Sequence, residues 1–155
     1  MTAAIALGSN LPSTFGPPDA NLREALHRLA PLGRVTAVST FHATDPVGYL
    51  NQPRFLNAAA LLETALSPLD LLSALIAIEQ AMGRDRSNTP AKGPRIIDLD
   101  LLLFGSEILH HTVLTLPHPA LHERRFVLAP LAEIAPTLRH PTLHRTISEL
   151  LAALP

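Results

Sequence analysis

Asp98 and Asp100 are the residues of this sequence whose type and spacing best suit catalytic chemistry. They lie in the apolar run IIDLDLLLF (96–104), which is bounded by Gly-Pro and Gly and predicts one β-strand. Side chains alternate along a strand, so both carboxylates share a face, about 6.5–7 Å apart, where they can reach one Mg²⁺ ion or an adjacent pair. The opposite face is apolar and can pack on a core: Ile97, Leu99, Leu101 and Leu103.

Two aspartates spaced in this way also fit an edge strand whose polar side faces water. Without a cation, however, two like charges beside several leucines should raise the pKa of at least one carboxyl, and a bound Mg²⁺ ion would remove that conflict. Arg95 lies just upstream, and no Lys or Arg within 96–104 neutralises the pair. These surroundings favour a metal site.

Basic residues flank the predicted strand on both sides. The segment 84–93 has no hydrophobic periodicity, which is typical of a loop; such a loop can close over an anion, although a solvated basic loop is the commoner finding. The sequence contains neither a P-loop nor a Gly-x-Gly-x-x-Gly motif. Two carboxylates for Mg²⁺ together with several guanidinium groups suggest phosphoryl-type transfer. The basic residues are Arg84, Arg86, Lys92, Arg95, Arg124 and Arg125.

The composition restricts the classes of protein to consider. A chain of 155 residues with 47% hydrophobic and 16% charged residues suits one globular domain, residues 1–155. A net charge of −1 provides no general basic field for nucleic acid or anionic membranes. The chain has no cysteine, and none of its eight histidines has His-Glu-x-x-His spacing, which disfavours thiolate and zinc chemistry. We expect a cytoplasmic protein, since no stretch has the pattern of a signal peptide or a membrane span, and the length and balance of charge favour a monomer.

Apolar and turn-forming positions predict the elements that carry these side chains. The expected order is a strand (3–7), a helix from 18, strands at 35–41 and 55–63, a helix from 68, the strand with the aspartates, a short strand (113–116) and helices at 128–134 and 147–154. The leading β-α-β-β-α-β order is typical of a ferredoxin-like α+β sandwich, in which two helices cover one face of a four-stranded antiparallel sheet. The other face would be free and would carry Phe55, Asn57, Asp98 and Asp100.

Six stretches stand in a characteristic order and spacing: ALGSNL (6–11), T-x-PVG (44–48), QP-x-FLNAA (52–59), E-x-x-x-GR (79–84), GPR-x-x-DLD-x-x-x-FG (93–105), and PHP with R-x-F (117–126). With them the chain resembles the 6-hydroxymethyl-7,8-dihydropterin pyrophosphokinase family of folate biosynthesis over nearly its full length. The resemblance implies a ferredoxin-like fold. It also implies transfer of the β,γ-pyrophosphoryl group of ATP to the pterin hydroxymethyl oxygen, with release of AMP.

The same resemblance implies a role for each matching residue. Asp98 and Asp100 would hold two Mg²⁺ ions, which is the arrangement expected for an in-line displacement. Arg84 and Arg95 would act with them by neutralising charge as the bond to the α-phosphate breaks. The residues implied for ATP binding are Glu79, Arg84, Arg86, Arg95, His118 and Arg124. Those implied for stacking on the pterin ring and reading its polar rim are Thr44, Pro46, Val47, Gly48, Phe55, Asn57 and Phe126.

The residues alone leave two other classes open. A two-metal nuclease or nucleotidyl transferase would also use paired aspartates on such a sheet, although the chain lacks a basic stripe for nucleic acid. A small-molecule-sensing module of the same fold would not need aspartates beside an arginine-rich loop. A pterin pyrophosphokinase with ATP and the pterin as substrates is therefore the leading hypothesis.

Overall fold

The computed structural model describes residues 1–46, 51–83 and 94–155. Within them, a five-stranded antiparallel sheet forms the centre, with the order β2-β4-β1-β5 and with β3 also paired to β4. This topology confirms the predicted α+β class and the ferredoxin-like order of strands. The strands are β1 (Thr2–Ser9), β2 (Arg34–Val38), β3 (His42–Thr44), β4 (Phe55–Glu63) and β5 (Asp98–Phe104).

The single strand expected at 35–41 is divided into β2 and β3. Ser39 still exchanges hydrogen bonds with Ala59 of β4, because the Ser39 backbone N–H donates to the Ala59 carbonyl at 2.9 Å and the Ala59 N–H donates to Ser39 Oγ at 2.9 Å. Thr40 and Phe41 then leave the strand, and pairing resumes at His42 opposite Asn57. The break makes β3 a strand of its own at the edge of the sheet.

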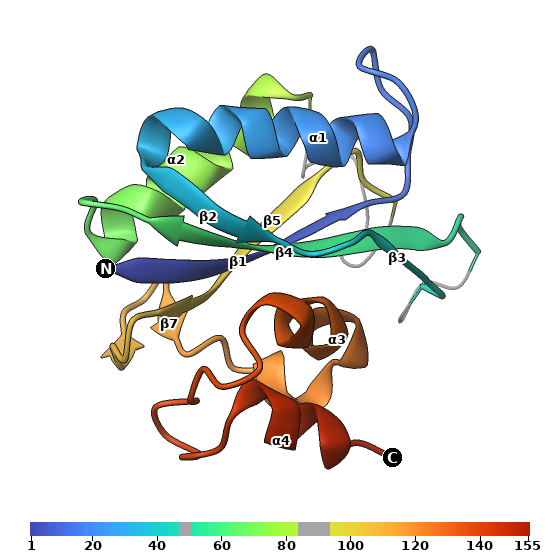
Figure 1. Ribbon diagram of the computed structural model, residues 1–155. Coiled ribbons are helices and arrows are strands. Elements are labelled where there is room, and N and C mark those ends of the chain that lie inside the picture. The colour runs from blue at the N-terminus through green and yellow to red at the C-terminus, as the bar shows by residue number, and fades with distance from the viewer. Residues whose placement is uncertain (47–50, 84–93) are drawn as a thin grey trace.

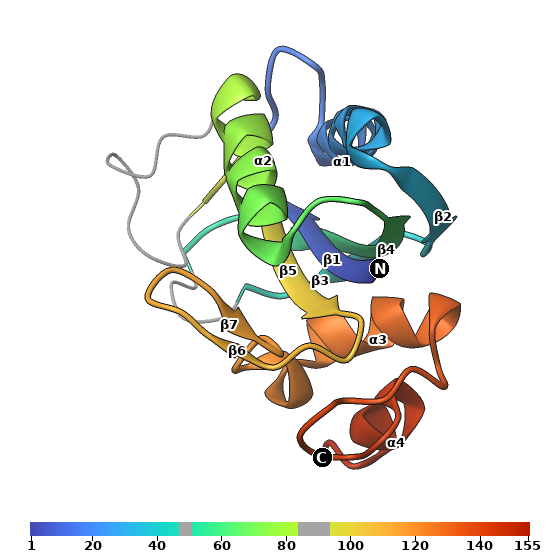
Figure 2. The ribbon, with the colours of Figure 1, turned by 90° about the vertical axis from the view of Figure 1, so that its left-hand side faces the viewer.

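Two helices, α1 (Pro18–Leu29) and α2 (Pro68–Ala81), cover one face of the sheet as expected (Figures 1 and 2). Both begin with a proline in the first turn, where its missing N–H costs no hydrogen bond. Ser67 caps α2 by accepting a hydrogen bond from the Asp70 N–H at 3.2 Å. Leu22, Leu75 and their neighbours form the larger hydrophobic core against the sheet.

The opposite face is not free, which corrects the sequence-based expectation. Helices α3 (Arg125–Ile134) and α4 (Ile147–Ala152) lie below the sheet in Figure 1 and bury a second core against it. The sheet contributes Ala4 and Ala59 to this core, and such small side chains let a helix approach closely. Two short strands, β6 (Leu109–His110) and β7 (Thr115–Leu116), and the 3-10 turns η1 (Ala30–Leu32) and η2 (Leu121–Glu123) complete the described elements.

Strand β5 follows the predicted alternation only as far as a bulge. Leu99 and Leu101 pack in the larger core, as predicted, while Asp98 and Asp100 face the other side. The register with β1 then shifts, because Ile5 pairs with Leu101 but Ala4 pairs with Leu103. Leu103 consequently joins the second core, so its predicted face is wrong.

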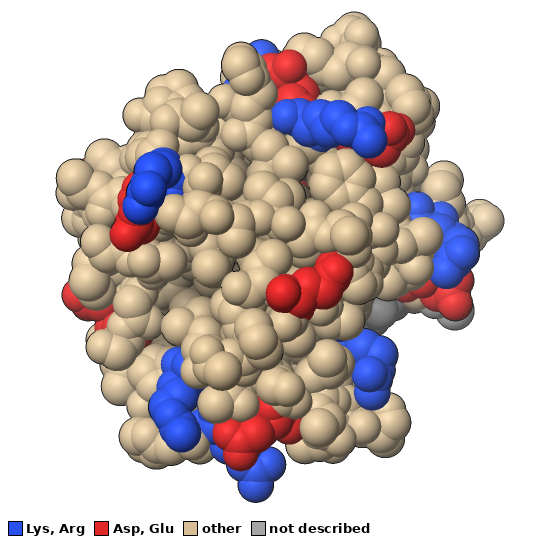
Figure 3. All heavy atoms as spheres, viewed as in Figure 1, with Lys and Arg blue, Asp and Glu red and all other residues tan. Residues whose placement is uncertain are grey.

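Charged side chains on the α1 side of the molecule lie beside charges of opposite sign (Figure 3). Ion pairs among the described residues include Arg28–Glu24 on α1 and Arg34–Glu63 between β2 and β4. In the part of the chain that the structure describes, no helix is both long and apolar enough to cross a bilayer.

Candidate active site

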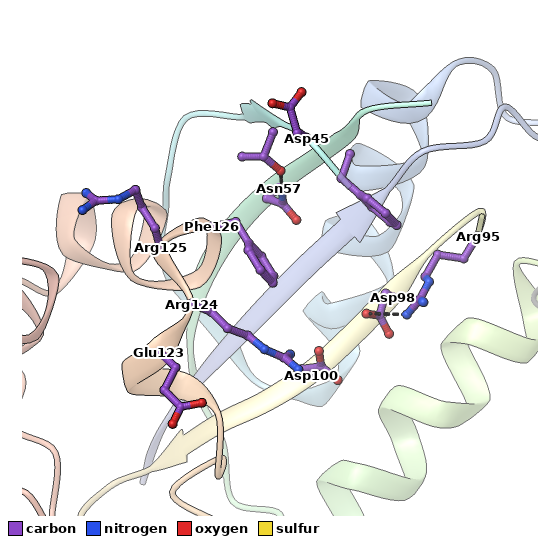
Figure 4. A pocket seen from close by; sticks show the side chains of 11 residues that line it. Asp45, Asn57, Arg95, Asp98, Asp100, Glu123, Arg124, Arg125 and Phe126 are labelled. Carbon is purple, nitrogen blue, oxygen red and sulfur yellow. Dashed lines mark hydrogen bonds and ion pairs between the residues drawn. The ribbon is translucent and has the colours of Figure 1, made fainter. Parts of the chain in front are cut away.

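A cavity of about 390 Å³ opens on the face of the sheet that carries the two aspartates, beside the N-terminal turn of α3 (Figure 4). Strand ends from β3, β4 and β5 form its floor, and η2 with the start of α3 forms its wall. The site is thus the part of this face that α3 does not cover. Its lining residues are Thr44, Asp45, Phe55, Asn57, Arg95, Asp98, Asp100, Glu123, Arg124, Arg125 and Phe126.

The aspartates occupy one end of the cavity. Asp98 is paired with Gly8 and Asp100 with Ala6 on β1, so both neighbours in the adjacent strand are small. Arg95 Nη1 donates a hydrogen bond to Asp98 Oδ2 at 3.1 Å, and the two side chains are only 16% and 23% exposed. Figure 4 shows the Arg124 side chain reaching toward Asp100 from the other wall. The arrangement brings carboxylates and guanidinium groups together, as the sequence predicts.

Asn10 fixes the backbone that carries Arg95. Its side-chain Oδ1 accepts a hydrogen bond from the Arg95 backbone N–H at 2.8 Å, and its backbone N–H donates to the Arg95 carbonyl at 3.1 Å. Its Nδ2 donates to Gln52 Oε1 at 2.9 Å and to the Pro53 carbonyl at 3.0 Å. With 1% of its surface exposed, Asn10 therefore joins the end of β1 to the two segments that precede β4 and β5.

We expect Asn10→Ala to remove this bridge, because alanine offers no partner for the Arg95 and Gln52 groups. The free energy of unfolding should fall by about 1–3 kcal/mol, the usual cost of leaving buried polar groups unpaired. Turnover should fall as well, since Arg95 would lose its fixed position. Chemical denaturation and steady-state kinetics would measure both effects, with Asn51→Ala, an exposed asparagine, as the matched control. Wild-type turnover in Asn10→Ala would contradict this role.

The other end of the cavity is aromatic. Phe55 and Asn57 line it from β4, and Phe126 lines it from α3. Asn57 Nδ2 donates to Thr44 Oγ1 at 2.6 Å, which orients the amide and leaves its second N–H and its oxygen for other partners. Gly8 borders this amide, since a Cβ there would lie 3.2 Å from Asn57 Oδ1. The pocket therefore offers two rings and one oriented amide.

Two guanidinium groups lie against these rings. The Arg95 guanidinium carbon is 5.7 Å from the centre of the Phe55 ring, and that of Arg124 is 5.7 Å from the centre of Phe126. Both contacts have the geometry of a cation–π interaction. Each arginine thus connects the acidic end of the cavity with its aromatic end.

His118 lies near the acidic end of the cavity but does not line the cavity itself. Its Nδ1 accepts the Ala120 N–H at 3.2 Å, which places the proton of the neutral ring on Nε2. Burial and the positive charge of Arg124 lower the pKa of His118, and the negative charge of Asp98 opposes that shift. His118 is therefore held as a neutral hydrogen-bond donor near Asp98 and Arg124.

Glu79 lies on the other side of β5. It is 2% exposed on α2, and its Oε2 accepts the Leu99 N–H at 2.8 Å, so it holds the backbone between the two aspartates from the helical face. Pro46, at the end of a described segment, is half-buried and follows Asp45. The remaining predicted site residues, together with the predicted anion-binding loop 84–93, lie outside the described residues: Val47, Gly48, Arg84 and Arg86.

Two lining residues, Asp45 and Glu123, were not predicted, and Arg125 was predicted only as one of the basic residues that flank the strand. Asp45 lies at the aromatic end, where its Oδ1 is 3.1 Å from Arg54 Nε. Glu123 and Arg125 flank Arg124, and Figure 4 shows Arg125 directed away from the aspartates. Asp45 follows the predicted site residue Thr44, and Glu123 and Arg125 flank the predicted site residue Arg124. These positions in the sequence are the signal that could have suggested a place in the site.

Comparison with known proteins identifies the family. A model described as 7,8-dihydro-6-hydroxymethylpterin-pyrophosphokinase (HPPK) matches residues 4–136. The chain belongs to the HPPK family. It is 49% identical over 151 residues to 2-amino-4-hydroxy-6-hydroxymethyldihydropteridine pyrophosphokinase of Pseudomonas aeruginosa, covering 97% of this chain and 90% of the relative. The enzyme of the same name from Bacillus subtilis is 47% identical over 135 residues, which are 85% of this chain and 77% of that one.

Solved structures agree in fold. A crystal structure of HPPK-DHPS in complex with substrates superposes with a TM-score of 0.75 at 16% identity, over 98% of this chain and 43% of that chain. Wild-type HPPK-DHPS of Plasmodium falciparum gives a TM-score of 0.77 at 17% identity, over 97% of this chain and 44% of that one. The chain thus spans less than half of these longer proteins, and the likeness confirms the ferredoxin-like fold of HPPK domains.

Family membership confirms the leading hypothesis from the sequence. HPPK proteins are diphosphokinases, and the activity of this chain is pyrophosphoryl transfer to hydroxymethyldihydropterin in folate biosynthesis. The nuclease and sensor alternatives receive no support from these matches.

Proposed function

We propose that the cavity binds the triphosphate of ATP at its acidic end, with two Mg²⁺ ions on Asp98 and Asp100, and the pterin at its aromatic end. The observation that carries this assignment is the convergence of both carboxylates, Arg95 and Arg124 on one cavity that also holds Phe55, Asn57 and Phe126. A reaction between a charged phosphate chain and a flat aromatic ring needs a site that is divided in this way. The two substrates would meet in the middle of the cavity.

The donor set fits Mg²⁺. This ion usually takes one or two carboxylates and completes its shell with water and substrate phosphates. Among the described residues, no group of three His, Cys, Asp or Glu side chains could hold a metal ion by itself. Two aspartates on one face, without a closed cage, match a metal that phosphate oxygens must help to bind. When bound, Mg²⁺ would supply charge stabilisation at the phosphates.

The arginines would bind and orient the phosphate chain. Arg95 donates to Asp98, and its guanidinium would turn to a phosphate oxygen where Asp98 holds Mg²⁺ instead. Arg124 can reach the phosphates from the opposite wall, and His118 can donate from Nε2 without adding a charge of its own. Arg84, Arg86 and Glu79 would contribute on the nucleotide side. Transfer leaves AMP and the pterin diphosphate.

The aromatic end would hold the pterin. Phe55 and Phe126 provide ring faces for a flat bicyclic ligand, and the Asn57 amide offers one donor and one acceptor to its polar rim. The backbone from Thr44 to Gly48 would complete the rim. In this orientation the hydroxymethyl group would point toward Asp98 and Asp100, where it would attack the phosphate chain.

A product assay tests the function. Purified protein is incubated with ATP, Mg²⁺ and 6-hydroxymethyl-7,8-dihydropterin, and AMP and ADP are resolved separately. We expect AMP in an amount equal to the pterin diphosphate, no AMP without the pterin, and no product after removal of Mg²⁺ with EDTA. Formation of ADP in place of AMP would overturn pyrophosphoryl transfer, and full activity in EDTA would overturn the metal requirement.

We expect Gly8→Ala to weaken pterin binding, because the added methyl group would lie 3.2 Å from Asn57 Oδ1 and force the amide to move. A displacement of a few tenths of an ångström should raise the pterin KM about three- to tenfold and leave the ATP KM nearly unchanged. Steady-state kinetics with each substrate varied in turn would measure the difference. In an Asn57→Ala background the same substitution should have little further effect, and a full additional loss there would contradict the mechanism.

A further inference from the structure

A hydrogen-bonded cluster outside the cavity joins α3 to the edge of the sheet. Glu133 of α3 accepts the Thr40 N–H at 3.1 Å, the Thr40 hydroxyl at 2.7 Å and 2.8 Å, and a hydrogen bond from His42 Nε2 at 2.9 Å. The side chains of His42 and Glu133 are 30% and 33% exposed. The hydrogen bonds from His42 and Thr40 lower the pKa of Glu133, so the carboxylate stays ionised. None of the residues assigned to substrate or metal belongs to this cluster.

The cluster adjoins the amide proposed to read the pterin. His42 pairs directly with Asn57 across β3 and β4, and Thr44 pairs with Phe55, so these four side chains share a face. Thr44 is also the hydrogen-bond acceptor that orients Asn57. His42 is thus the residue directly opposite Asn57 on β3, and Glu133 holds its imidazole by a hydrogen bond.

Both elements that Glu133 joins lack part of the backbone hydrogen bonding of a regular element. Strand β3 has only three residues, all paired to β4 alone. Helix α3 contains Pro130, which has no N–H to donate to the carbonyl of Phe126 four residues earlier. Glu133 lies seven residues after Phe126, which is about two helical turns, and therefore on the same side of α3. The Glu133 carboxylate thus joins the strand that carries Thr44 to the helix that carries Phe126.

We propose that Glu133 is a positioning residue for pterin binding, which holds His42 and β3 so that the Asn57 amide stays oriented by Thr44. The inference rests on the proposed pterin role of Asn57. Without Glu133, the His42 imidazole is free to take the Asn57 amide as its partner, in competition with Thr44. The amide would then turn away from the ligand, and β3 would lose its connection to α3.

The test compares Glu133→Ala and Glu133→Gln with the wild-type protein in steady-state kinetics, varying the pterin and ATP separately. Glu133→Ala should raise the pterin KM about five- to tenfold, while kcat and the ATP KM stay within about twofold. Glu133→Gln should show a smaller loss, since its amide oxygen can still accept from Thr40. Glu149→Gln is the matched control, because Glu149 accepts the Thr146 N–H in α4, away from the cavity. It should match the wild-type protein in all three constants.

His42→Ala separates positioning from simple support of the fold. If the released imidazole disturbs Asn57, the double variant with Glu133→Ala and His42→Ala should recover part of the pterin affinity that Glu133→Ala alone loses. If Glu133 is a purely structural contact, the double variant should show no such recovery. A pterin KM within twofold of wild type in Glu133→Ala would overturn the inference. So would equal losses in kcat and both KM values, accompanied by a lower melting temperature in circular dichroism.

Asn57→Ala distinguishes this failure from failure of the proposed function. If Asn57→Ala weakens the pterin and Glu133→Ala does not, only the role of Glu133 is wrong. If Asn57→Ala leaves the pterin KM unchanged, the proposed pterin site and the inference are both overturned.

Discussion

Replacing Asp98 by alanine should lower kcat by more than about 100-fold, because Mg²⁺ held at this carboxylate would contribute several kcal/mol of charge stabilisation to the transferring phosphates. Asp98 lies at the acidic end of the cavity and shares its face of β5 with Asp100. Asp100→Ala should have an effect of the same order. Initial rates of AMP formation, measured over a range of Mg²⁺ concentrations, would quantify both losses.

The control for this prediction is Asp19→Ala, which removes an exposed carboxylate of α1 that pairs with Arg23 far from the cavity. It should retain wild-type turnover. Asp98→Ala also removes the hydrogen-bond partner of Arg95, so Asp98→Asn provides a second comparison, since its amide oxygen can still accept from Arg95. A large loss in Asp98→Asn would point to the metal, whereas near-wild-type turnover in Asp98→Ala would refute the metal role altogether.

Arg95→Ala should reduce kcat by about 100-fold or more while changing pterin affinity much less. The guanidinium is proposed to contact the phosphoryl group as it is transferred, and a contact that strengthens in the transition state is lost from kcat rather than from ground-state binding. Loss of the cation–π contact with Phe55 would account for a modest change in pterin affinity. Single-turnover kinetics and calorimetric titration of the pterin would separate the two quantities.

Arg95→Lys sharpens this prediction, because lysine keeps the charge but cannot form two parallel hydrogen bonds to phosphate. It should recover only part of the lost rate. Arg34→Ala is the matched control, since Arg34 forms an exposed ion pair with Glu63 on the strand edge away from the cavity. If Arg95→Ala weakened pterin binding as much as it lowered kcat, Arg95 would be a structural support of the pocket and not a phosphate ligand.

Much of the site could be predicted because it depends on local periodicity. Alternation along 97–101 places Asp98 and Asp100 on one face and Leu99 on the other without any knowledge of the fold. Likewise, the range predicted for β4 agrees with the structure, so the positions of Phe55 and Asn57 on that strand follow. The face predicted for Leu103 is wrong, because a bulge opposite Ala4 and Ile5 changes the register of β5. Nothing in the run of leucines marks the position of this bulge.

Features that depend on tertiary contact could not be predicted in this way. Periodicity indicates helices near 128–134 and 147–154 but not the face of the sheet on which they pack. Asn10 and Arg95 are 85 residues apart, and no local pattern connects them. Glu79 shows the same limit, because a carboxylate on an apolar stripe indicates a partner, whereas only the fold shows that one partner is the Leu99 backbone.

The buried carboxylate of Glu79 also has a consequence for self-association. Strand β5 ends the described sheet, and the free edge of such a strand is a template on which another chain can add a strand. Glu79 takes the Leu99 N–H, and the His118 N–H donates to the Leu102 carbonyl at 2.9 Å. The hydrogen-bonding groups that an incoming strand would need at these positions are therefore already occupied. The strand that carries Asp98 and Asp100 is thus protected against edge-to-edge aggregation by a side chain from one face of the sheet and a backbone segment that follows β7.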